Sequence, residues 1–152
     1  MNWANLSGLE SLKLIVEGKI PPPSMALTMS LKIVKVEKGY AEFSAVADDR
    51  YLNPAGTVHG GFAATVLDSV TGCAVHTMLE AGDTYGTVDL NVKMLKPIPL
   101  GVQLIAKSWI IQVSSRLGTA YGTLTDDKGT LYSHATATCL ITRKNSSPIN
   151  GS

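Results

Sequence analysis

The sequence has few cysteines and few charged side chains, and each shortage excludes a class of protein. Its 152 residues include only two cysteines, Cys73 and Cys139, with no CxxC spacing between them. Both lie in apolar patterns, so we expect free thiols in the core rather than a disulfide or a metal site. Charged residues make up 16% of the chain and the formal net charge is +1. This balance excludes a broad surface for nucleic acid or anionic membrane.

Long apolar runs are also missing. No stretch reaches the roughly 18 apolar residues that a membrane span requires. The first residues, MNWANLSGLESLKLIVEGK, lack the basic start and apolar block of a signal peptide. We therefore expect a cytoplasmic protein with no membrane partner. Apolar residues still make up 45% of the chain and the mean hydropathy is +0.15, which predicts one dense domain with further apolar surface buried between subunits.

The hydrophobic pattern predicts a helix, two strands, one long helix and four further strands. An N-terminal helix is expected at 5–18, and the triproline at 21–23 ends it as a stiff spacer. The other expected elements are strands at 27–37 and 40–47, a helix at 60–79, and strands at 84–96, 102–114, 119–125 and 130–142. This order indicates an α+β fold in which a curled antiparallel sheet wraps a buried helix. We expect one domain over 1–152, with its core at about 27–142 and a mobile tail at 145–152.

A carboxylate stands inside the pattern of the long helix. At about 100° per residue, mostly small side chains share the side that Asp68 faces. They are Gly61, Ala64, Thr65, Thr71, Gly72, Val75 and Leu79. The opposite side carries large side chains such as Phe62 and Val66, which suit packing on a sheet. We expect Asp68 to project from a groove of small residues, although such a stripe also suits close approach of a second helix.

The same helix begins with His59-Gly60-Gly61. Free N–H groups at a helix N-terminus attract an anion or a developing oxyanion, and glycine allows a substrate to approach the backbone. Gly-Gly can equally serve only as a tight turn. The acid nine positions after His59 makes the combination more specific.

Gly60 and Asp68 cannot serve one reacting carbon from a single helix. They are eight positions apart, or about 12 Å along the axis at roughly 1.5 Å per residue. A base and its oxyanion donors must both lie about 3 Å from the reacting group. Two antiparallel helices in a twofold dimer can meet that requirement. The spacing therefore predicts two active sites shared between subunits.

These motifs together resemble a known family. The pattern Asn53-x5-His59-Gly60-Gly61-x6-Asp68 is followed by TVDLN at 87–91, Lys96-Pro97 and Arg116-x-Gly118. It resembles the hotdog-fold acyl-CoA thioesterases of the phenylacetate-pathway (PaaI-like) type. The resemblance implies hydrolysis of an acyl- or aryl-acyl-CoA to free acid and CoA, with no cofactor beyond the CoA of the substrate. It also implies a homodimer with shared sites that pairs into a homotetramer.

The resemblance assigns five catalytic positions. Asp68 matches the carboxylate that acts as nucleophile or as base for water, and the Gly60 N–H matches the group that polarises the thioester carbonyl. His59 and Asn53 match side chains that line the carbonyl or hold the lytic water, and Thr87 matches a hydroxyl that orients that water. The substrate-binding candidates are Gly61, Thr65, Thr71, Gly72, Lys93, Lys96, Arg116 and Gly118. Arg116 could meet CoA phosphates through its guanidinium fork, though exposed cations are commonly only solvated.

Two other functions remain possible from the sequence. A non-catalytic acyl-CoA-binding module would use the same groove, and a hotdog hydratase or dehydratase would need a His and an acid set for proton abstraction. The dehydratase-type HFPG motif and the GxSxG elbow of a serine hydrolase are both absent. His76 and His134 lack partners at diagnostic spacing, and we interpret both as structural or surface residues.

Overall fold

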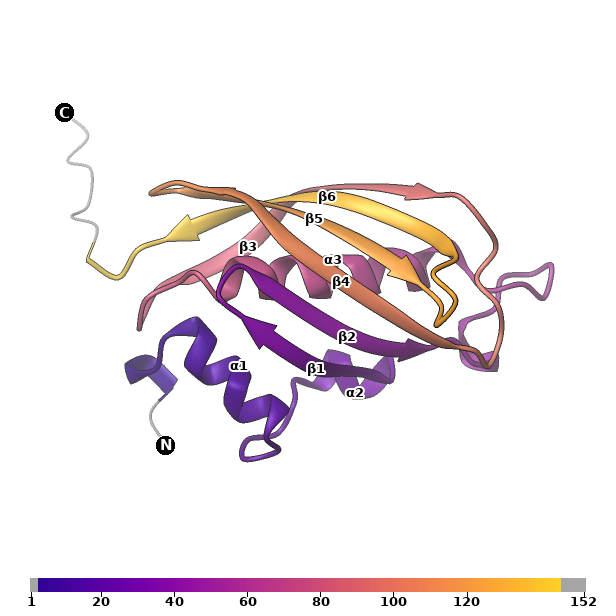
Figure 1. Cartoon of the computed structure of the whole chain (residues 1–152), viewed down its shortest axis with the longest axis horizontal. Coiled ribbons are helices and arrows are strands. Elements are labelled where there is room, and N and C mark those ends of the chain that lie inside the picture. Colours follow the sequence, from indigo (N-terminus) through magenta and orange to yellow (C-terminus); the bar gives the residue numbers. More distant parts are fainter. Residues whose placement is uncertain (1–2, 146–152) are drawn as a thin grey trace.

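The computed structural model describes residues 3–145, in which a curled antiparallel sheet wraps around one long helix (Figure 1). The strands lie in the order β1-β2-β4-β5-β6-β3. Their bounds are β1 Leu31–Glu37, β2 Tyr40–Val46, β3 Thr84–Met94, β4 Gln103–Val113, β5 Leu117–Thr125 and β6 Leu131–Thr142. The α+β architecture predicted from the pattern is confirmed. Of the tail predicted to be mobile, residues 146–152 lie outside the described residues.

The central helix α3 (Gly60–His76) supplies the middle of the core. Phe62, Val66 and Val70 are at most 2% exposed, as expected for a helix that is apolar nearly all round. The helix was predicted to run to residue 79, but it ends at His76 and a turn carries the chain from Thr77 onward. Because the sheet curls over α3, most of the helix surface is enclosed.

The N-terminal segment forms a layer of its own beside β1 (Figure 1). A short 3-10 turn (Trp3–Asn5) leads into α1 (Gly8–Val16), which starts with a reciprocal capping box between Ser7 and Glu10. After the triproline comes α2 (Ser24–Thr28), where the pattern predicted the start of a strand. That prediction was wrong because the spacing of apolar residues over so few positions does not separate a helical turn from a strand. No helix in residues 3–145 is long and apolar enough to span a bilayer.

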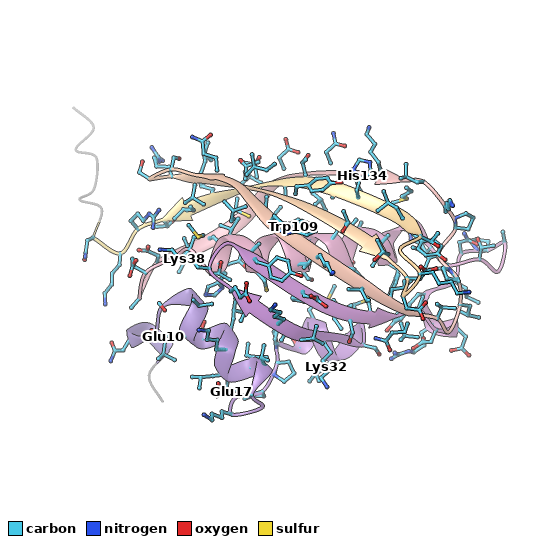
Figure 2. All side chains as sticks on the ribbon, viewed as in Figure 1. Glu10, Glu17, Lys32, Lys38, Trp109 and His134 are labelled. Atoms are coloured by element: carbon cyan, nitrogen blue, oxygen red, sulfur yellow. The ribbon has the colours of Figure 1, made fainter. Side chains whose placement is uncertain are left out.

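The outer face of the sheet carries a row of rings that runs across neighbouring strands. The ring centroids of Tyr40 and Trp109 lie 5.7 Å apart, those of Trp109 and Tyr121 6.4 Å, and those of Tyr121 and His134 6.0 Å. Figure 2 shows Trp109 and His134 on this outer face, on the far side of the sheet from α3. His134 therefore lies on the outer face, half-buried in this row of rings, and the candidate site must be sought on the inner face.

We expect Gly8→Ala to destabilise the fold by about 1–3 kcal/mol, the usual cost of overpacking. A Cβ on Gly8 would overlap the backbone carbonyl and the ring of His76, and the Gly8 N–H donates to the Leu79 carbonyl at 3.0 Å. The free energy of unfolding from urea titration measures the effect. Lys13→Ala, on the exposed side of α1, is the control. A Gly8→Ala chain as stable as the parent would contradict this tight docking of α1 on α3.

Candidate functional site

The first site element is the N-terminus of α3. His59 is the N-cap, and its Nδ1 accepts the Gly61 N–H at 2.7 Å. A neutral imidazole that accepts at Nδ1 carries its proton on Nε2, so His59 keeps one outward donor. The Gly60 N–H donates to no acceptor in the part of the chain that the structure describes. This helix terminus thus presents one unused backbone donor beside one imidazole donor.

The loop before α3 holds that terminus in place. The His59 N–H donates to the Tyr51 carbonyl at 2.7 Å, and a bridge pairs Leu52 with Val58. Asn53 closes the loop: its Oδ1 accepts the N–H groups of Ala55 and Thr57, and its Nδ2 donates to the Thr57 hydroxyl at 2.8 Å. Asn53 therefore supports the loop that positions His59. Its predicted contact with a substrate carbonyl or a water stays a prediction.

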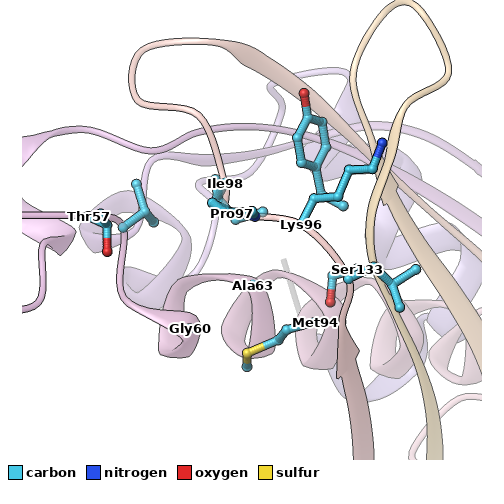
Figure 3. Close-up of a pocket in the computed structure, with 11 residues that line it drawn as sticks. Thr57, Gly60, Ala63, Met94, Lys96, Pro97, Ile98 and Ser133 are labelled. Carbon is cyan, nitrogen blue, oxygen red and sulfur yellow. The ribbon is translucent and has the colours of Figure 1, made fainter.

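A cavity of about 350 Å³ opens beside the Gly60 end of the helix (Figure 3). Its walls come from the loop before α3, the first turn of α3, the segment after β3, and β6. The lining residues are Thr57, Val58, Gly60, Ala63, Met94, Leu95, Lys96, Pro97, Ile98, Tyr132 and Ser133. Met94 lies close to Gly60, so that a Cβ there would be 2.7 Å from its Sδ. Lys96 lies at this cavity, with its amino group directed away from Gly60 (Figure 3).

The second site element is Asp68, in the middle of α3. Its Oδ1 is buried and has no hydrogen-bond partner among residues 3–145. Thr87 of β3 and Cys139 of β6 are register partners, with Oγ1 and Sγ 3.8 Å apart. Burial and then the charge of Asp68 raise the pKa of Cys139, while the Thr87 contact lowers it in part. Thr87 is thus a direct neighbour of Cys139, and the charge of Asp68 acts on the same thiol. An unsatisfied buried carboxylate oxygen is a candidate for function.

The thiols and His76 are poor candidates for the chemistry. Both cysteines are free, and burial raises the pKa of the Cys73 thiol to about 12. A protonated thiol is a weak nucleophile. Burial also lowers the pKa of His76, whose ring packs edge-on against Tyr85 at 5.3 Å between centroids. Among these groups, the Asp68 carboxylate is the one that suits attack or proton abstraction near neutral pH.

Within one chain, the two site elements stay apart. Gly60 lines the 350 Å³ cavity and Asp68 does not. The two residues are separated by about 12 Å of one continuous helix. The described chain therefore presents two halves of a candidate site, an unused backbone donor at one point and a carboxylate at another.

The groove of small residues expected beside Asp68 is closed on one side. Thr71 is fully buried, and its methyl group lies 3.0 Å from where a Gly122 Cβ would be. Gly72 lies under the Tyr85 ring, and Gly118 packs on Val75. The helical wheel placed Thr71 and Gly72 correctly relative to Asp68, but it could not show that the curled sheet covers this side too. Gly61 and Thr65 remain partly exposed, and the Thr65 hydroxyl donates to the Gly61 carbonyl at 2.9 Å.

The predicted cationic residues lie at separate places on the surface. Arg116 is exposed in the turn between β4 and β5, and its side chain makes no hydrogen bond or ion pair within residues 3–145. Lys93 is exposed on β3, and Lys96 is the predicted cation that lines a cavity. One chain does not bring the three amino and guanidinium groups together around either half of the site.

Tyr85 is a site neighbour whose relation to Asp68 the motif did not reveal. Burial raises its pKa far above the ordinary value, with smaller contributions from Cys73, Cys139 and Asp68. Its ring lies over Gly72 of α3, where a Cβ would be 3.1 Å from Cε2. The alternation of a strand gives the signal, because residues 85 and 87 share one face. The resemblance to the thioesterases had implied a hydroxyl at Thr87, which lies on that same face.

β3 forms one edge of the sheet and is poorly covered. Within residues 3–145, its eleven residues pair only with β6. Val88 and Met94 are 61% and 56% exposed. A long edge strand with exposed apolar side chains is a surface on which another strand can pair. This edge lies beside Thr87 and therefore beside the Asp68 half of the site.

Comparison with known proteins identifies a family and a shared fold. Residues 55–133 match the Thioesterase superfamily. A phenylacetic acid degradation-related protein from Ralstonia eutropha is 34% identical, with a TM-score of 0.78 over 85% of this chain and 98% of that one. A Streptococcus mutans protein solved with acetyl-CoA has a TM-score of 0.69 over 76% of this chain and 91% of its own, but at 24% identity it shows the fold alone.

Curated relatives match over shorter stretches. Acyl-coenzyme A thioesterase 13 from mouse is 29% identical over 79 residues, which is 52% of this chain and 56% of that protein. The chain spans about half the length of the curated relatives it matches. The family match begins after Asn53 and covers the whole of α3 and β3 to β5, so it includes both Gly60 and Asp68. The hotdog fold is confirmed, and this chain belongs to the Thioesterase superfamily.

Proposed function

We propose that this protein hydrolyses the thioester of an acyl-CoA to a free acid and CoA. The observation that carries the proposal is Asp68 Oδ1, a buried carboxylate oxygen without a partner among residues 3–145, on the same helix as the unused Gly60 N–H. The family and the acyl-CoA thioesterase from mouse support this substrate class. The identity of the acyl group is a separate question.

The proposed reaction needs few groups because thiolate is a good leaving group. Asp68 either attacks the carbonyl carbon or removes a proton from the water that attacks it. The carbonyl oxygen gains the negative charge, which the Gly60 N–H and the helix N-terminus stabilise. When the tetrahedral carbon collapses, the C–S bond breaks and its electron pair leaves with CoA sulfur, which takes up a proton. On the nucleophile route, water then cleaves the acyl-aspartate anhydride.

The active site is proposed to form between two subunits. Each α3 N-terminus would face the partner's Asp68, since one helix keeps its own pair about 12 Å apart. The exposed edge of β3 is the surface best suited to bring two copies together by strand pairing. That dimers associate into a tetramer stays a prediction. The cytoplasmic location is a prediction as well.

A non-catalytic acyl-CoA-binding module is the alternative, since the same groups could bind a thioester without turning it over. Release of free CoA, followed with a thiol reagent over a panel of acyl-CoAs, separates the two. Binding of acyl-CoA without release of CoA above the uncatalysed rate would reject the hydrolase in favour of the module.

We expect Arg116→Ala to raise KM by about 3- to 10-fold, equivalent to about 0.7–1.4 kcal/mol, with kcat nearly unchanged. An exposed guanidinium with no partner within residues 3–145 can bind a CoA phosphate, and that contact is the same in ground and transition states. Arg116→Lys keeps the charge but loses the planar guanidinium fork, so its KM should lie between those of the parent and of Arg116→Ala. A large loss of kcat at constant KM would reject this role.

A further inference from the structure

A second and larger cavity lies between the N-terminal segment and the body of the domain. Its volume is about 740 Å³, within the roughly 300–1,000 Å³ range of small-molecule sites. One wall is formed by α1, the triproline and α2, and the other by β1, β2, the second half of α3 and the start of β3. Lining residues from the two walls include Val16, Pro22, Ala26, Phe43, Cys73 and Tyr85.

The N-terminal segment is fixed at both ends, which keeps this space from collapsing. At one end Gly8 contacts His76 and donates to the Leu79 carbonyl. At the other end the Tyr51 hydroxyl donates to the Thr28 carbonyl at 2.8 Å, and Arg50 donates to the Ser30 hydroxyl at 2.9 Å. Between these ends, the triproline resists bending. The segment thus covers one side of the cavity as a stiff wall.

The cavity lies next to the Asp68 half of the candidate site along α3. Ser69 lines it and follows Asp68 directly on α3. Tyr85 also lines it, and the charge of Asp68 contributes to the raised pKa of that phenol after burial, the larger cause. From Ser69 the lining continues along α3 to Cys73 and His76, about 10 Å further along the helix. A group attached to a carbonyl at Asp68 could extend into this space beneath α1.

The interior of the cavity offers no charged group to a ligand. Its charged lining residues are Glu17 and Lys32, and both are exposed. Of the polar groups from α3, Cys73 has a pKa of about 12 because it is buried, and burial lowers the pKa of His76. Both are therefore neutral near pH 7. Burying an unpaired charge or hydroxyl here would be costly, whereas burial of methylene groups is favourable.

From this geometry we infer that the cavity beneath the N-terminal segment receives the acyl group of the substrate, and that this group is an uncharged apolar chain of medium or greater length. The inference rests on the proposed thioesterase function and adds the substrate class. It makes α1 and α2 determinants of specificity, although they lie outside the segment that matches the family.

The activity profile follows from the lining. We expect kcat/KM to rise at least about 10-fold from acetyl-CoA to decanoyl-CoA, because burial of each added methylene in this cavity is favourable. Adipyl-CoA should be hydrolysed at least about 10-fold less efficiently than hexanoyl-CoA, which has the same length without the terminal carboxylate. Equal rates for these two, or a preference for acetyl-CoA or phenylacetyl-CoA over decanoyl-CoA, would contradict the inference.

The direct test introduces a larger side chain from α1 into the cavity. Val16 lines it and Lys13 does not, although both belong to the same helix and Lys13 is exposed. Val16→Trp should lower kcat/KM for decanoyl-CoA at least about 10-fold while acetyl-CoA hydrolysis stays at the parental rate. Lys13→Trp should hydrolyse decanoyl-CoA and acetyl-CoA with the parental kcat/KM. Ala26→Phe, which narrows the same space from α2, should repeat the loss if Val16→Trp is unstable.

Binding of free decanoate separates this inference from the proposed function. Calorimetry should show decanoate binding to the parent and to Lys13→Trp, with at least about 10-fold weaker binding to Val16→Trp. Decanoate binding of this pattern without any acyl-CoA hydrolysis would overturn the hydrolase and leave the cavity assignment standing. Hydrolysis with a chain-length profile that neither Val16→Trp nor Ala26→Phe changes would overturn the cavity assignment and leave the hydrolase standing.

Discussion

Asp68→Asn should lower kcat roughly 10²-fold or more, the scale expected when a general base or nucleophile is lost. The amide keeps the size of the side chain and removes the charge that attacks carbon or deprotonates water. Folding should survive because Oδ1 has no hydrogen-bond partner to lose among residues 3–145. Stability can rise, since burying an uncompensated charge is costly. Free-CoA release and urea unfolding measure the two effects.

The control for Asp68→Asn removes a carboxylate elsewhere. Asp127 is exposed in the turn between β5 and β6, so Asp127→Asn should leave kcat and stability at the parental values. Affinity for acyl-CoA should also change little in Asp68→Asn, because the cavity walls are untouched. An Asp68→Asn enzyme that hydrolyses every acyl-CoA at the parental rate would remove Asp68 from the mechanism, and one that fails to fold would give it a structural role.

Mixing Asp68→Asn chains with Gly60→Pro chains should restore about a quarter of the parental activity. Each single variant is expected to be nearly inactive, because every shared site lacks either the carboxylate or the backbone donor. With random pairing, about half of the dimers are mixed, and one of the two sites in each mixed dimer is intact, as twofold symmetry requires. Activity after unfolding and refolding the chains together gives the measurement.

Proline suits this experiment because it removes the donor without breaking the helix. Gly60 is the first residue of α3 and His59 before it is extended, with ψ 136°, the conformation that proline requires of its predecessor. Gly60→Ala is the matched control: it keeps the N–H and displaces only the flexible end of Met94. If mass spectrometry confirms mixed dimers and no activity returns, the site does not combine residues of two subunits.

Much of the fold was predictable because its elements have strong periodic signals. The apolar run from Gly60 onward is too long for a strand, and the Val- and Thr-rich runs after it carry strand propensity with clear turn residues between them. The bounds moved by a few residues where the apolar pattern continues into a turn, as it does after His76. The short helix α2 was not predicted because five residues are too few to show either a helical or a strand period.

The candidate site was likewise predictable only in part. Local spacing along one helix was enough to pair Asp68 with Gly60 and to predict that a single chain cannot unite them, since helical rise is a property of the backbone. Spacing could not place Thr71, Gly72 and Gly118 inside the core, because their burial depends on how the sheet curls over α3. Nor could it reveal Tyr85 beside Asp68 or the cavity beneath α1 and α2. Those features arise from contacts between residues distant in the chain, and only their packing decides which surfaces meet and which leave a space.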